Sequence, residues 1–319
     1  MSTSATLNPA QVAALRARFR DRLQENVPLA NLTAARVGGP ADFLLGVESA
    51  QELEEAVRWL WEYHLPFIVL GSGANVLISD RGVRGLVILN RARKVEIRSE
   101  EEPPTVWAES GANLGLIARS VALRGLSGLE WATAIPGTLG GAIYGNAGAH
   151  GQDMAHTLIL AEILHRERGR ETWPCEHFAY GYRTSILKAH PGEAVILSAL
   201  LRLQRSTRES VQAQIEAFAA YRKRTQPPGA SMGSVFKNPP GDYAGRLIEA
   251  AGLKGTRVGG VEVSQIHANF FVNDEKATAS DYWALIRLVR HRVFETFGVN
   301  LELEIERLGD WDDDSPNNW

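Results

Sequence analysis

Hydrophobic residues near the start of the chain recur with the period of a helix. Apolar side chains at every third or fourth position predict an amphipathic helix over residues 9–24, with Asn8 as its N-cap. Ser49 and Glu52 have the spacing of a capping box and predict a second helix that ends near His64. Short apolar runs around this second helix predict buried strands at 43–47, 67–70 and 85–89. The order of these elements is that of a β-α-β unit.

Strands predominate from residue 94 onwards. Apolar runs predict them at 95–98, 105–108, 158–165 and 195–203, with one helix at 114–124. Another amphipathic helix is predicted over residues 207–224, where Ser206 and Glu209 have capping-box spacing. It leads into the breaker sequence Gln-Pro-Pro-Gly at 226–229, which is typical of a boundary loop.

The last third of the chain predicts a further α+β unit. Helices are expected at 243–251 and 281–297, the second with Thr278 and Asp281 near its start, and a strand at 270–272. Residues 301–308 are predicted to form a strand, because apolar side chains alternate with glutamates over 301–306 and place the glutamates on one solvated face. The spacing alone does not single out any one of Glu302, Glu304 and Glu306.

These changes of pattern predict three domains and a tail. The predicted ranges are 1–90, 91–206 and 207–299, with the strand at 300–308 returning toward the first domain and an acidic, disordered tail at 309–319.

Composition narrows the possible partners. The chain of 319 residues is 45% hydrophobic and 22% charged, with a net charge of −3, so neither nucleic acid nor an acidic membrane surface is expected to bind it. Cys175 is the single cysteine, which excludes an internal disulfide. The sequence has no secretory signal, no apolar run of membrane-spanning length and no histidine spacing typical of a metal site. We therefore expect a cytoplasmic protein without a metal or membrane insertion.

Residues 128–151 contain seven glycines and few charged side chains. Glycine lets backbone N–H groups approach a ligand without a Cβ in the way. A turn at Pro136 and Gly137 precedes a predicted short helix at 138–144, whose first N–H groups would face a phosphate. Asn146 and the glycines after it predict a second loop around the same ligand. The alternative is close packing between helices, since a single glycine-rich motif is a weak signal.

A second glycine-rich segment, Gly71-Ser-Gly-Ala-Asn75, ends the predicted strand at 67–70. It is not the dinucleotide fingerprint, because Val76 stands where glycine is required and no helix follows. Alone it is equally consistent with a tight turn. Two such loops in two domains predict a ligand with a central pyrophosphate, held between the domains.

Three further segments carry candidate chemistry. Ser234 lies in the loop 232–239, which lacks the G-x-S-x-G elbow of hydrolases, so a hydrogen-bonding or proton-donating role is favoured. Arg183 follows Tyr182 and has the geometry to clamp a carboxylate or phosphate, although a surface salt bridge is the more common role of a single arginine. His267 is expected to be a core or capping residue on spacing alone.

Together these segments resemble the UDP-N-acetylenolpyruvoylglucosamine reductase family. The motifs that match in order are Thr33…Arg36-Val-Gly-Gly-Pro-Ala-Asp42, Val69-Leu-Gly-Ser-Gly-Ala-Asn-Val-Leu77, Ile135-Pro-Gly…Gly-Gly-Ala…Asn-Ala-Gly-Ala149 and Gly233-Ser-Val-Phe-Lys-Asn-Pro239. Shorter matches are Gly181-Tyr-Arg…Ser185, Ala251-Gly-Leu-Lys-Gly255, Gly259-Gly260 and Leu301-Glu-Leu-Glu304, so the resemblance covers residues 29–308.

The resemblance implies an α+β fold with a two-domain FAD-binding module of the vanillyl-alcohol-oxidase type and a third α+β domain that binds substrate. It also implies noncovalent FAD, NADPH as hydride donor and reduction of the enolpyruvyl group of a UDP-sugar in peptidoglycan synthesis. A monomer is expected. Rival interpretations are another flavin oxidoreductase with the same cofactor-binding domains, or a catalytically silent nucleotide-binding or cell-wall scaffold protein.

By the same resemblance, the catalytic positions are Arg183, Ser234 and Glu304, with Ser234 as the proton donor. The implied substrate-binding residues are Tyr182, Lys237, Asn238 and His267. The implied cofactor-binding residues are Arg36, Gly71, Ser72, Gly73, Ala74, Asn75, Val76, Ile135, Pro136, Gly137, Gly140, Gly141, Ala142, Asn146, Gly148 and Ala149. The chain departs from the family at Ala74, where serine is usual, and at Ala134, where glycine is usual. It resembles the shorter type of the family, which lacks a tyrosine-bearing loop over the substrate.

Overall fold

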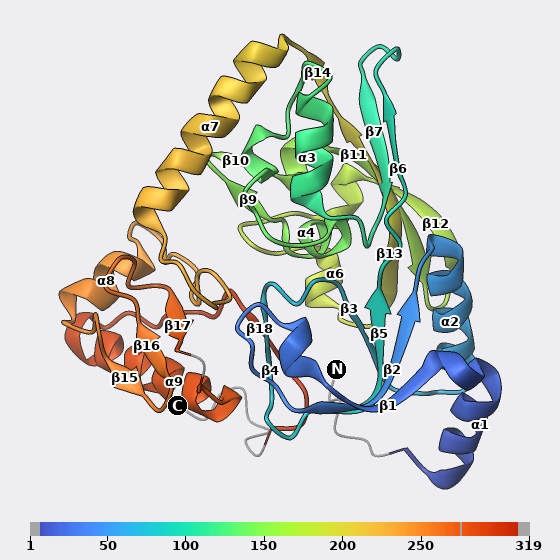
Figure 1. The fold of residues 1–319 in the computed structure, drawn as a ribbon, viewed down its shortest axis with the longest axis horizontal. Helices are drawn as coiled ribbons and strands as arrows, with labels where there is room; N and C mark the ends of the chain where they lie inside the picture. Colours follow the sequence, from blue (N-terminus) through green and yellow to red (C-terminus); the bar gives the residue numbers. More distant parts are fainter. Residues whose placement is uncertain (1–6, 275, 312–319) are drawn as a thin grey trace.

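The computed structural model describes residues 7–274 and 276–311. A four-stranded sheet of order β1-β2-β5-β3 forms the first unit, at the lower right of Figure 1. Strands β2, β5 and β3 are parallel, and β1 pairs antiparallel with β2 at the edge. The elements of this unit are α1 (Pro9–Phe19), β1 (Leu23–Pro28), β2 (Pro40–Val47), α2 (Ala50–Glu62), β3 (Phe67–Leu70), β4 (Val76–Ile78) and β5 (Val83–Asn90).

Alternating side chains of β2 bury both faces of this sheet. Phe43 and Leu45 pack with Leu53 and Leu60 of α2, whereas Leu44 packs on the opposite face. Leu164 and other residues of the second sheet belong to the same core as α2. The first two units are therefore joined by a continuous apolar core.

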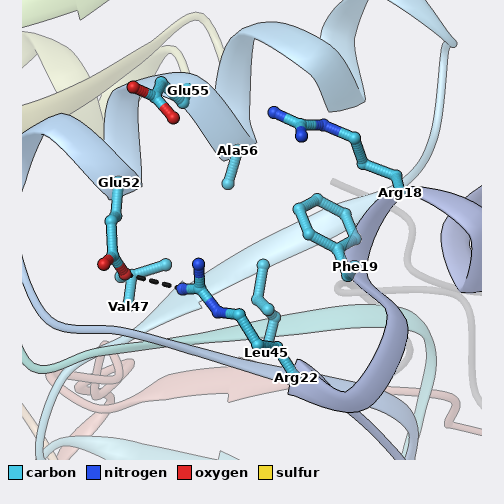
Figure 2. A pocket seen from close by; sticks show the side chains of 8 residues that line it. All are labelled: Arg18, Phe19, Arg22, Leu45, Val47, Glu52, Glu55 and Ala56. Atoms are coloured by element: carbon cyan, nitrogen blue, oxygen red, sulfur yellow. Dashed lines mark hydrogen bonds and ion pairs between the residues drawn. The ribbon is translucent and has the colours of Figure 1, made fainter.

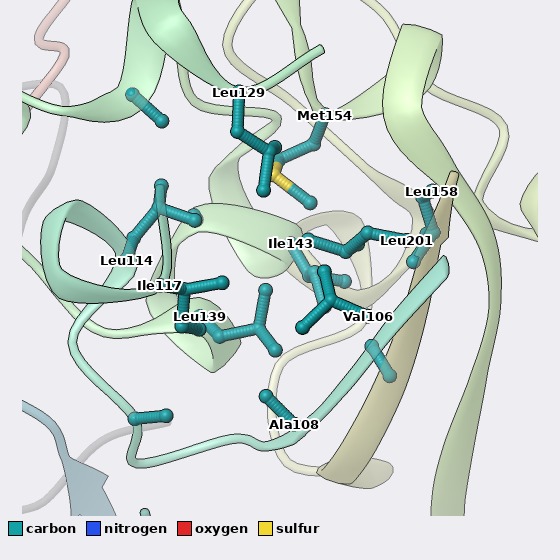
Figure 3. Close-up of a cluster of buried hydrophobic side chains, with 14 of the residues drawn as sticks. Val106, Ala108, Leu114, Ile117, Leu129, Leu139, Ile143, Met154, Leu158 and Leu201 are labelled. Atoms are coloured by element: carbon teal, nitrogen blue, oxygen red, sulfur yellow. The ribbon is translucent and has the colours of Figure 1, made fainter. Parts of the chain in front are cut away.

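The second unit is an antiparallel sheet of five strands, in the order β12-β11-β13-β7-β6. Its elements are β6 (Val95–Arg98), β7 (Thr105–Glu109), α3 (Leu114–Ala122), β8 (Leu126–Ser127), α4 (Leu139–Gly145), β9 (Gly148–Ala149), β10 (Gln152–Asp153), α5 (Met154–Thr157), β11 (Leu158–His165), β12 (Gly169–Pro174), α6 (Ile186–Ala189), β13 (Ala194–Arg202) and β14 (Gln204–Arg205). Figure 3 shows how side chains of β7, α3 and α4 point toward one another, among them Val106, Ile117, Leu139 and Ile143. This core gives the glycine-rich stretch around α4 a rigid base.

The third unit, at the lower left of Figure 1, is reached through the long helix α7. A small antiparallel sheet of order β15-β16-β17 packs here with α8 and α9. The elements are α7 (Arg208–Thr225), α8 (Ala244–Ala250), β15 (Arg257–Val258), β16 (Val261–Val263), β17 (Phe271–Asn273), α9 (Ala279–Phe297) and β18 (Glu306–Leu308). The sheets follow the predicted order of units, while the domain boundaries proposed near residues 90 and 206 remain a prediction.

Several predicted elements need correction. The first helix ends at Phe19 rather than at residue 24, because Arg20 has a φ of 46° and Leu23–Pro28 forms β1 on the edge of β2. Thr207 rather than Ser206 caps α7, since its side chain accepts from the Ser210 N–H. Only half of the predicted box at α2 forms: Ser49 accepts from the Glu52 N–H, while the Glu52 carboxylate accepts from the Glu48 N–H. At α9, Thr278 and Asp281 form a capping box, in which each side chain accepts from the backbone N–H of the other.

The predicted strand at 301–308 is shorter than expected. Only Glu306–Leu308 forms a strand, β18, which pairs parallel with β4 of the first unit. Earlier in this segment Leu303 makes an isolated bridge to Phe236. The chain end thus returns to the first unit. Of the predicted tail, Trp311 packs on Trp283 with ring centroids 6.0 Å apart, and residues 312–319 lie outside the described part of the chain.

Asp80 joins the first and third units at the start of α9. Its carboxylate accepts from the N–H groups of Ala279 and Ser280, both at 2.8 Å, and from the Ser280 hydroxyl at 2.6 Å. Thr278 satisfies the next N–H of the helix, that of Asp281. The N-terminal N–H groups of α9 are therefore satisfied partly from another unit.

Replacement of Asp80 by alanine removes these acceptors and leaves two N–H groups of α9 without a protein partner. We expect Asp80→Ala to lower the free energy of unfolding by about 1–2 kcal/mol, the usual value of a lost helix cap. Asp80→Asn, which keeps one oxygen acceptor, is expected to lose less. Chemical denaturation of the three proteins checks this, and equal midpoints would contradict it.

Candidate active site

The two glycine-rich loops meet in the structure. The segment Gly71–Asn75 follows β3, and Thr138 caps α4. A Cβ added at Gly71 would lie 2.5 Å from the Thr138 hydroxyl oxygen, so any larger residue would push the loops apart. A Cβ at Gly73, which has a φ of +63°, would lie 2.0 Å from the Leu32 carbonyl oxygen. The loops are glycine-rich because three backbone segments converge here.

Free backbone amides line the same place. The N–H groups of residues 71–75 donate no hydrogen bond to another described residue, nor do those of Gly137 and Thr138. A Cβ at Gly137 would meet nothing within 4 Å, and one at Gly141 only the Thr138 hydroxyl at 3.6 Å. Unpaired amides beside open space form the kind of cradle that binds phosphate oxygens. The residues present therefore fit the diphosphate of a dinucleotide cofactor.

The predicted use of the first N–H groups of α4 is wrong. The Leu139 N–H donates to Ala112 O and the Gly140 N–H to Ser110 O, both at 2.8 Å, and the Gly141 N–H donates to the Thr138 hydroxyl at 3.4 Å. Packing requires these bonds, because α4 lies against the loop after β7. The amides available to an anion are those just ahead of the helix.

The remaining predicted cofactor-binding residues differ in how tightly they are packed and how exposed they are. Gly140 and Gly148 are tightly packed, since a Cβ at either would lie less than 3 Å from a protein atom. Ala142 and Asn146 are buried, Ile135, Ala149 and Val76 are half-buried, and Pro136 is exposed. Arg36 is exposed, in a loop whose Ala34 N–H donates to Gly73 O at 3.0 Å. Contact of these residues with a cofactor stays a prediction.

Arg183 is held by carbonyl oxygens of the glycine-rich stretch and by one carboxylate. Its Nη2 lies 2.7 Å from Gly148 O, its Nη1 3.4 Å from Asn146 O and its Nε 2.8 Å from the Glu304 Oε1. The Asn146 side chain donates to Gly181 O at 3.0 Å and so fixes the loop that carries Arg183. Arg183 itself has a φ of 57°, a left-handed conformation that costs energy and is typical of functional positions.

Glu304 connects three segments at one point. Its carboxylate pairs with Arg183, its N–H donates to Val235 O at 2.8 Å, and its carbonyl accepts from Asn75 Nδ2 at 3.1 Å. The carboxylate side chain is 18% exposed, compared with 77% for Glu302. Strict alternation therefore wrongly placed Glu304 on a solvated face. Burial raises the pKa of Glu304, although Arg183 opposes the shift.

This raised pKa predicts a pH-dependent stability. A carboxyl whose pKa is raised in the folded state stabilises the protein below its unfolded pKa of about 4.3, and that stabilisation is lost as pH rises through the folded pKa. Relative to Glu304→Gln, the wild type should therefore lose free energy of unfolding as pH is raised from about 4, until the folded carboxyl is ionised. Thermal unfolding of both proteins across pH measures this. A difference independent of pH would contradict it.

Ser234 lies close to Glu304, because the next residue, Val235, accepts a hydrogen bond from the Glu304 N–H. Its backbone bridges to Phe270, its side chain is half-buried, and the hydroxyl makes no hydrogen bond to another described residue. The hydroxyl is therefore available to a ligand. Arg183, Glu304 and the backbone of Ser234 meet in one place, as the resemblance implies, while their catalytic roles stay a prediction.

The predicted substrate residues are spread around this point. Tyr182 is 53% exposed, and its hydroxyl lies 3.5 Å from the Asn238 N–H, which links the Arg183 loop to the Ser234 loop. The Lys237 Nζ lies 3.4 Å from Glu302, and Asn238 Oδ1 accepts from the Ala244 N–H at the start of α8. His267 accepts from the Asn269 N–H through Nδ1 at 3.2 Å, and burial lowers its pKa. His267 is half-buried in a turn, with its ring bonded to a nearby backbone N–H, and its contact with substrate stays a prediction.

The sequence analysis missed Lys188 and Glu306, which form an ion pair of 2.6 Å beside Arg183 and Glu304. The pattern around Lys188 carried no signal for it, because its partner lies far away in the sequence. A separate pocket lies between α1 and α2, where Arg22 pairs with Glu52 at 2.6 Å (Figure 2). None of the predicted site residues lines it.

The fold and site define an FAD-dependent oxidoreductase. Residues 41–171 match the family model described as "FAD binding domain", and residues 225–308 match "UDP-N-acetylenolpyruvoylglucosamine reductase, C-terminal domain". The fold is α+β, with an FAD-binding module over the first two units and a third unit. In the described residues, 7–274 and 276–311, no helix has the length and apolar character needed to cross a membrane.

The chain belongs to the UDP-N-acetylenolpyruvoylglucosamine reductase family, a family of FAD-dependent reductases of peptidoglycan synthesis. It is 45% identical to the enzyme of that name from Chloroflexus aggregans over 89% of this chain and 96% of the relative. Identity to the Rubrobacter xylanophilus enzyme is 48%, over 89% and 94%. The crystal structure of the Thermus caldophilus reductase superposes with a TM-score of 0.76 at 36% identity, over 90% of this chain and 98% of that one.

Proposed function

We propose that this protein reduces the enolpyruvyl group of UDP-N-acetylglucosamine enolpyruvate to give UDP-N-acetylmuramate, with NADPH as the source of hydride. The reaction adds one hydride to the terminal vinyl carbon and one proton to the carbon that bears the carboxylate. Bound FAD supplies the hydride after its reduction by NADPH. We further propose that the protein works in the cytoplasm as a monomer, without nucleic acid or membrane insertion.

Arg183 and Glu304 are proposed to stabilise the charge that develops on the substrate. When hydride reaches the vinyl carbon, negative charge grows onto the carboxylate oxygens, and a fixed cation aimed at those oxygens lowers the barrier. The Arg183 guanidinium is such a cation, and its Nη2 donates to Gly148 O at 2.7 Å. Glu304 is kept protonated more readily by its burial, and in that form it donates a hydrogen bond.

Ser234 is proposed to deliver the proton. A carbanion-like carbon beside a carboxylate is a strong base and accepts a proton even from a weakly acidic hydroxyl. The Ser234 hydroxyl has no hydrogen-bond partner among residues 7–274 and 276–311, which supports this role. The role requires the substrate carbon to lie within about 3–3.5 Å of that hydroxyl.

Binding of the diphosphate is proposed for the side chains around the same loop. The Lys237 ammonium lies 3.4 Å from the exposed Glu302 and can exchange this partner for a phosphate. Asn238 and Tyr182 lie beside it and offer an amide and a phenol as donors. His267 would contact the substrate from the third unit.

One observation carries the proposal: the Arg183–Glu304 pair and the backbone of Ser234 converge on the Val235–Glu304 hydrogen bond, next to Asn75 of the glycine-rich loop. The test is an absorption spectrum of the purified protein, which should carry the bands of a bound flavin. NADPH should bleach these bands under exclusion of oxygen, and the enolpyruvyl sugar nucleotide should restore them. Bleaching by NADPH without recovery on addition of the sugar nucleotide would reject this substrate.

A further inference from the structure

Residues 304–306 are held by two sets of contacts, one to their backbone and one to their side chains. On the cofactor side the contacts are made by its backbone: the Glu306 N–H donates to Asn75 O at 2.9 Å, and Glu304 O accepts from Asn75 Nδ2 at 3.1 Å. On the opposite side they are made by side chains: Glu304 pairs with Arg183, and Glu306 pairs with Lys188. The second of these ion pairs has no part in the chemistry proposed above.

Lys188 is placed to act on Arg183 and on the Glu304 segment at once. Its Nζ lies 2.6 Å from Glu306 Oε1 and 3.4 Å from Arg183 O. The Lys188 side chain is 18% exposed and that of Glu306 32% exposed, so this is not a solvated surface pair. The base of the lysine is fixed, because its N–H donates to the Ser185 hydroxyl and that hydroxyl donates to Tyr144 O at the end of α4.

We propose that Lys188 and Glu306 are positioning residues for Arg183 and Glu304. Their ion pair ties the loop 181–188 to the segment 304–306, and it keeps a second carboxylate from competing for the Arg183 guanidinium. The expected effect of this ion pair on catalysis rests on the proposed function. The geometry of the ion pair does not depend on that function.

The charges explain why the pair is needed. Two cations and two carboxylates form two ion pairs, Arg183 with Glu304 and Lys188 with Glu306, so each carboxylate has one cation. The other charged group that acts on Glu304 is Lys237, and Glu306 also acts on the half-buried Tyr144. Without Lys188, the half-buried Glu306 carboxylate would be left without its cation, and Arg183 would be the other cation of the same loop.

Removal of the two partners should have opposite electrostatic effects. Lys188→Met removes a positive charge that favours ionised Glu304, so the pKa of Glu304 should rise. Glu306→Gln leaves the Lys188 charge without its carboxylate, so the pKa of Glu304 should fall. In the double variant both charges are absent, and the pKa should lie near that of the wild type. A pair with a purely structural role would not produce shifts of opposite sign.

The first measurement is the pH dependence of flavin reoxidation by the enolpyruvyl sugar nucleotide, on FAD-loaded, NADPH-reduced protein. On the alkaline side of the profile, the pH at which activity is half lost should rise by about half to one unit in Lys188→Met and should fall in Glu306→Gln. In the double variant it should return to the wild-type value. The rate in Lys188→Met should fall about tenfold or more through displacement of Arg183. A matched control is the exposed pair Lys94 and Glu96, 2.7 Å apart. The same substitutions in this pair should change neither the pH profile nor the rate of flavin reoxidation.

A second measurement needs no turnover. In a double-mutant cycle of thermal unfolding, Lys188→Met should cost more stability than Lys188→Met/Glu306→Gln, because only the single variant leaves a half-buried carboxylate unpaired. If the wild type is not reoxidised by the sugar nucleotide, the proposed substrate fails while this cycle still tests the pair. Additive stabilities in the cycle, or limbs that move in the same direction or not at all, would overturn the inference.

Discussion

Ser234→Ala should leave reduction of the flavin by NADPH almost unchanged and slow its reoxidation by the enolpyruvyl sugar nucleotide. We expect a loss of about 10²–10⁴-fold, the usual contribution of a positioned proton donor. The reason is that the hydroxyl is unbonded within the described chain and half-buried, so its removal deletes a proton source without breaking a protein contact. Stopped-flow absorption of the flavin measures the two half-reactions separately.

Ser231 offers a matched control for this experiment. It is half-buried, lies in the same loop three residues before Ser234, and has no proposed chemistry. Ser231→Ala should therefore leave both half-reactions near the wild-type rates. If Ser234→Ala slowed both half-reactions equally, the serine would have a structural role and the proton would come from another group.

The second large effect is expected at Arg183. Arg183→Met should lower kcat/KM for the sugar nucleotide by about 10²–10³-fold, because the cation that faces the developing charge is lost. The Glu304 carboxylate, 18% exposed, is at the same time left without its ion-pair partner. Arg183→Lys keeps the charge but not the forked geometry that bonds Gly148 O and Glu304 together, so it should recover only part of the loss.

Arg58 provides the comparison for Arg183. It pairs with Glu54 at 2.6 Å on the surface of α2 and is 49% exposed. Arg58→Met should leave kcat/KM unchanged, and Glu54, whose side chain is 15% exposed, still has Arg170 as an ion-pair partner at 3.2 Å. Equal activities of Arg183→Met and wild type would remove Arg183 from the proposed mechanism.

The spacing of hydrophobic residues predicted most of the helices and strands that have a regular repeat and an apolar face of their own. The strands at 67–70, 95–98 and 158–165 and the short helix after Thr138 form where expected. Strand β1 was mistaken for the end of a helix because Leu23 continues the helical spacing, and only its pairing with β2 makes it extended. The edge strand β12 was also missed: its residues alternate between exposed and half-buried, so it has no apolar run of its own.

The candidate site was predicted in part. Glycine content identified both loops, but it did not reveal that Gly71 touches Thr138, since that contact joins segments far apart in sequence. Alternation assigned all three glutamates of residues 302–306 to solvent, and the resemblance alone singled out Glu304. The Lys188–Glu306 pair carried no local signal at all, because a lysine in a short helix and a glutamate in a charged strand are individually ordinary.

The return of the chain end to β4 has a consequence for synthesis. Glu304 and Glu306 bond Asn75, so the loop proposed to hold the cofactor is completed by residues that are translated long after it. Units folded early on the ribosome can form their own sheets, as N-terminal segments generally do. The proposed reaction centre cannot close in the same way, because the segment of Glu304 is translated only after the first two units. A chain released early would therefore resemble the finished protein in much of its shape and still lack its chemistry.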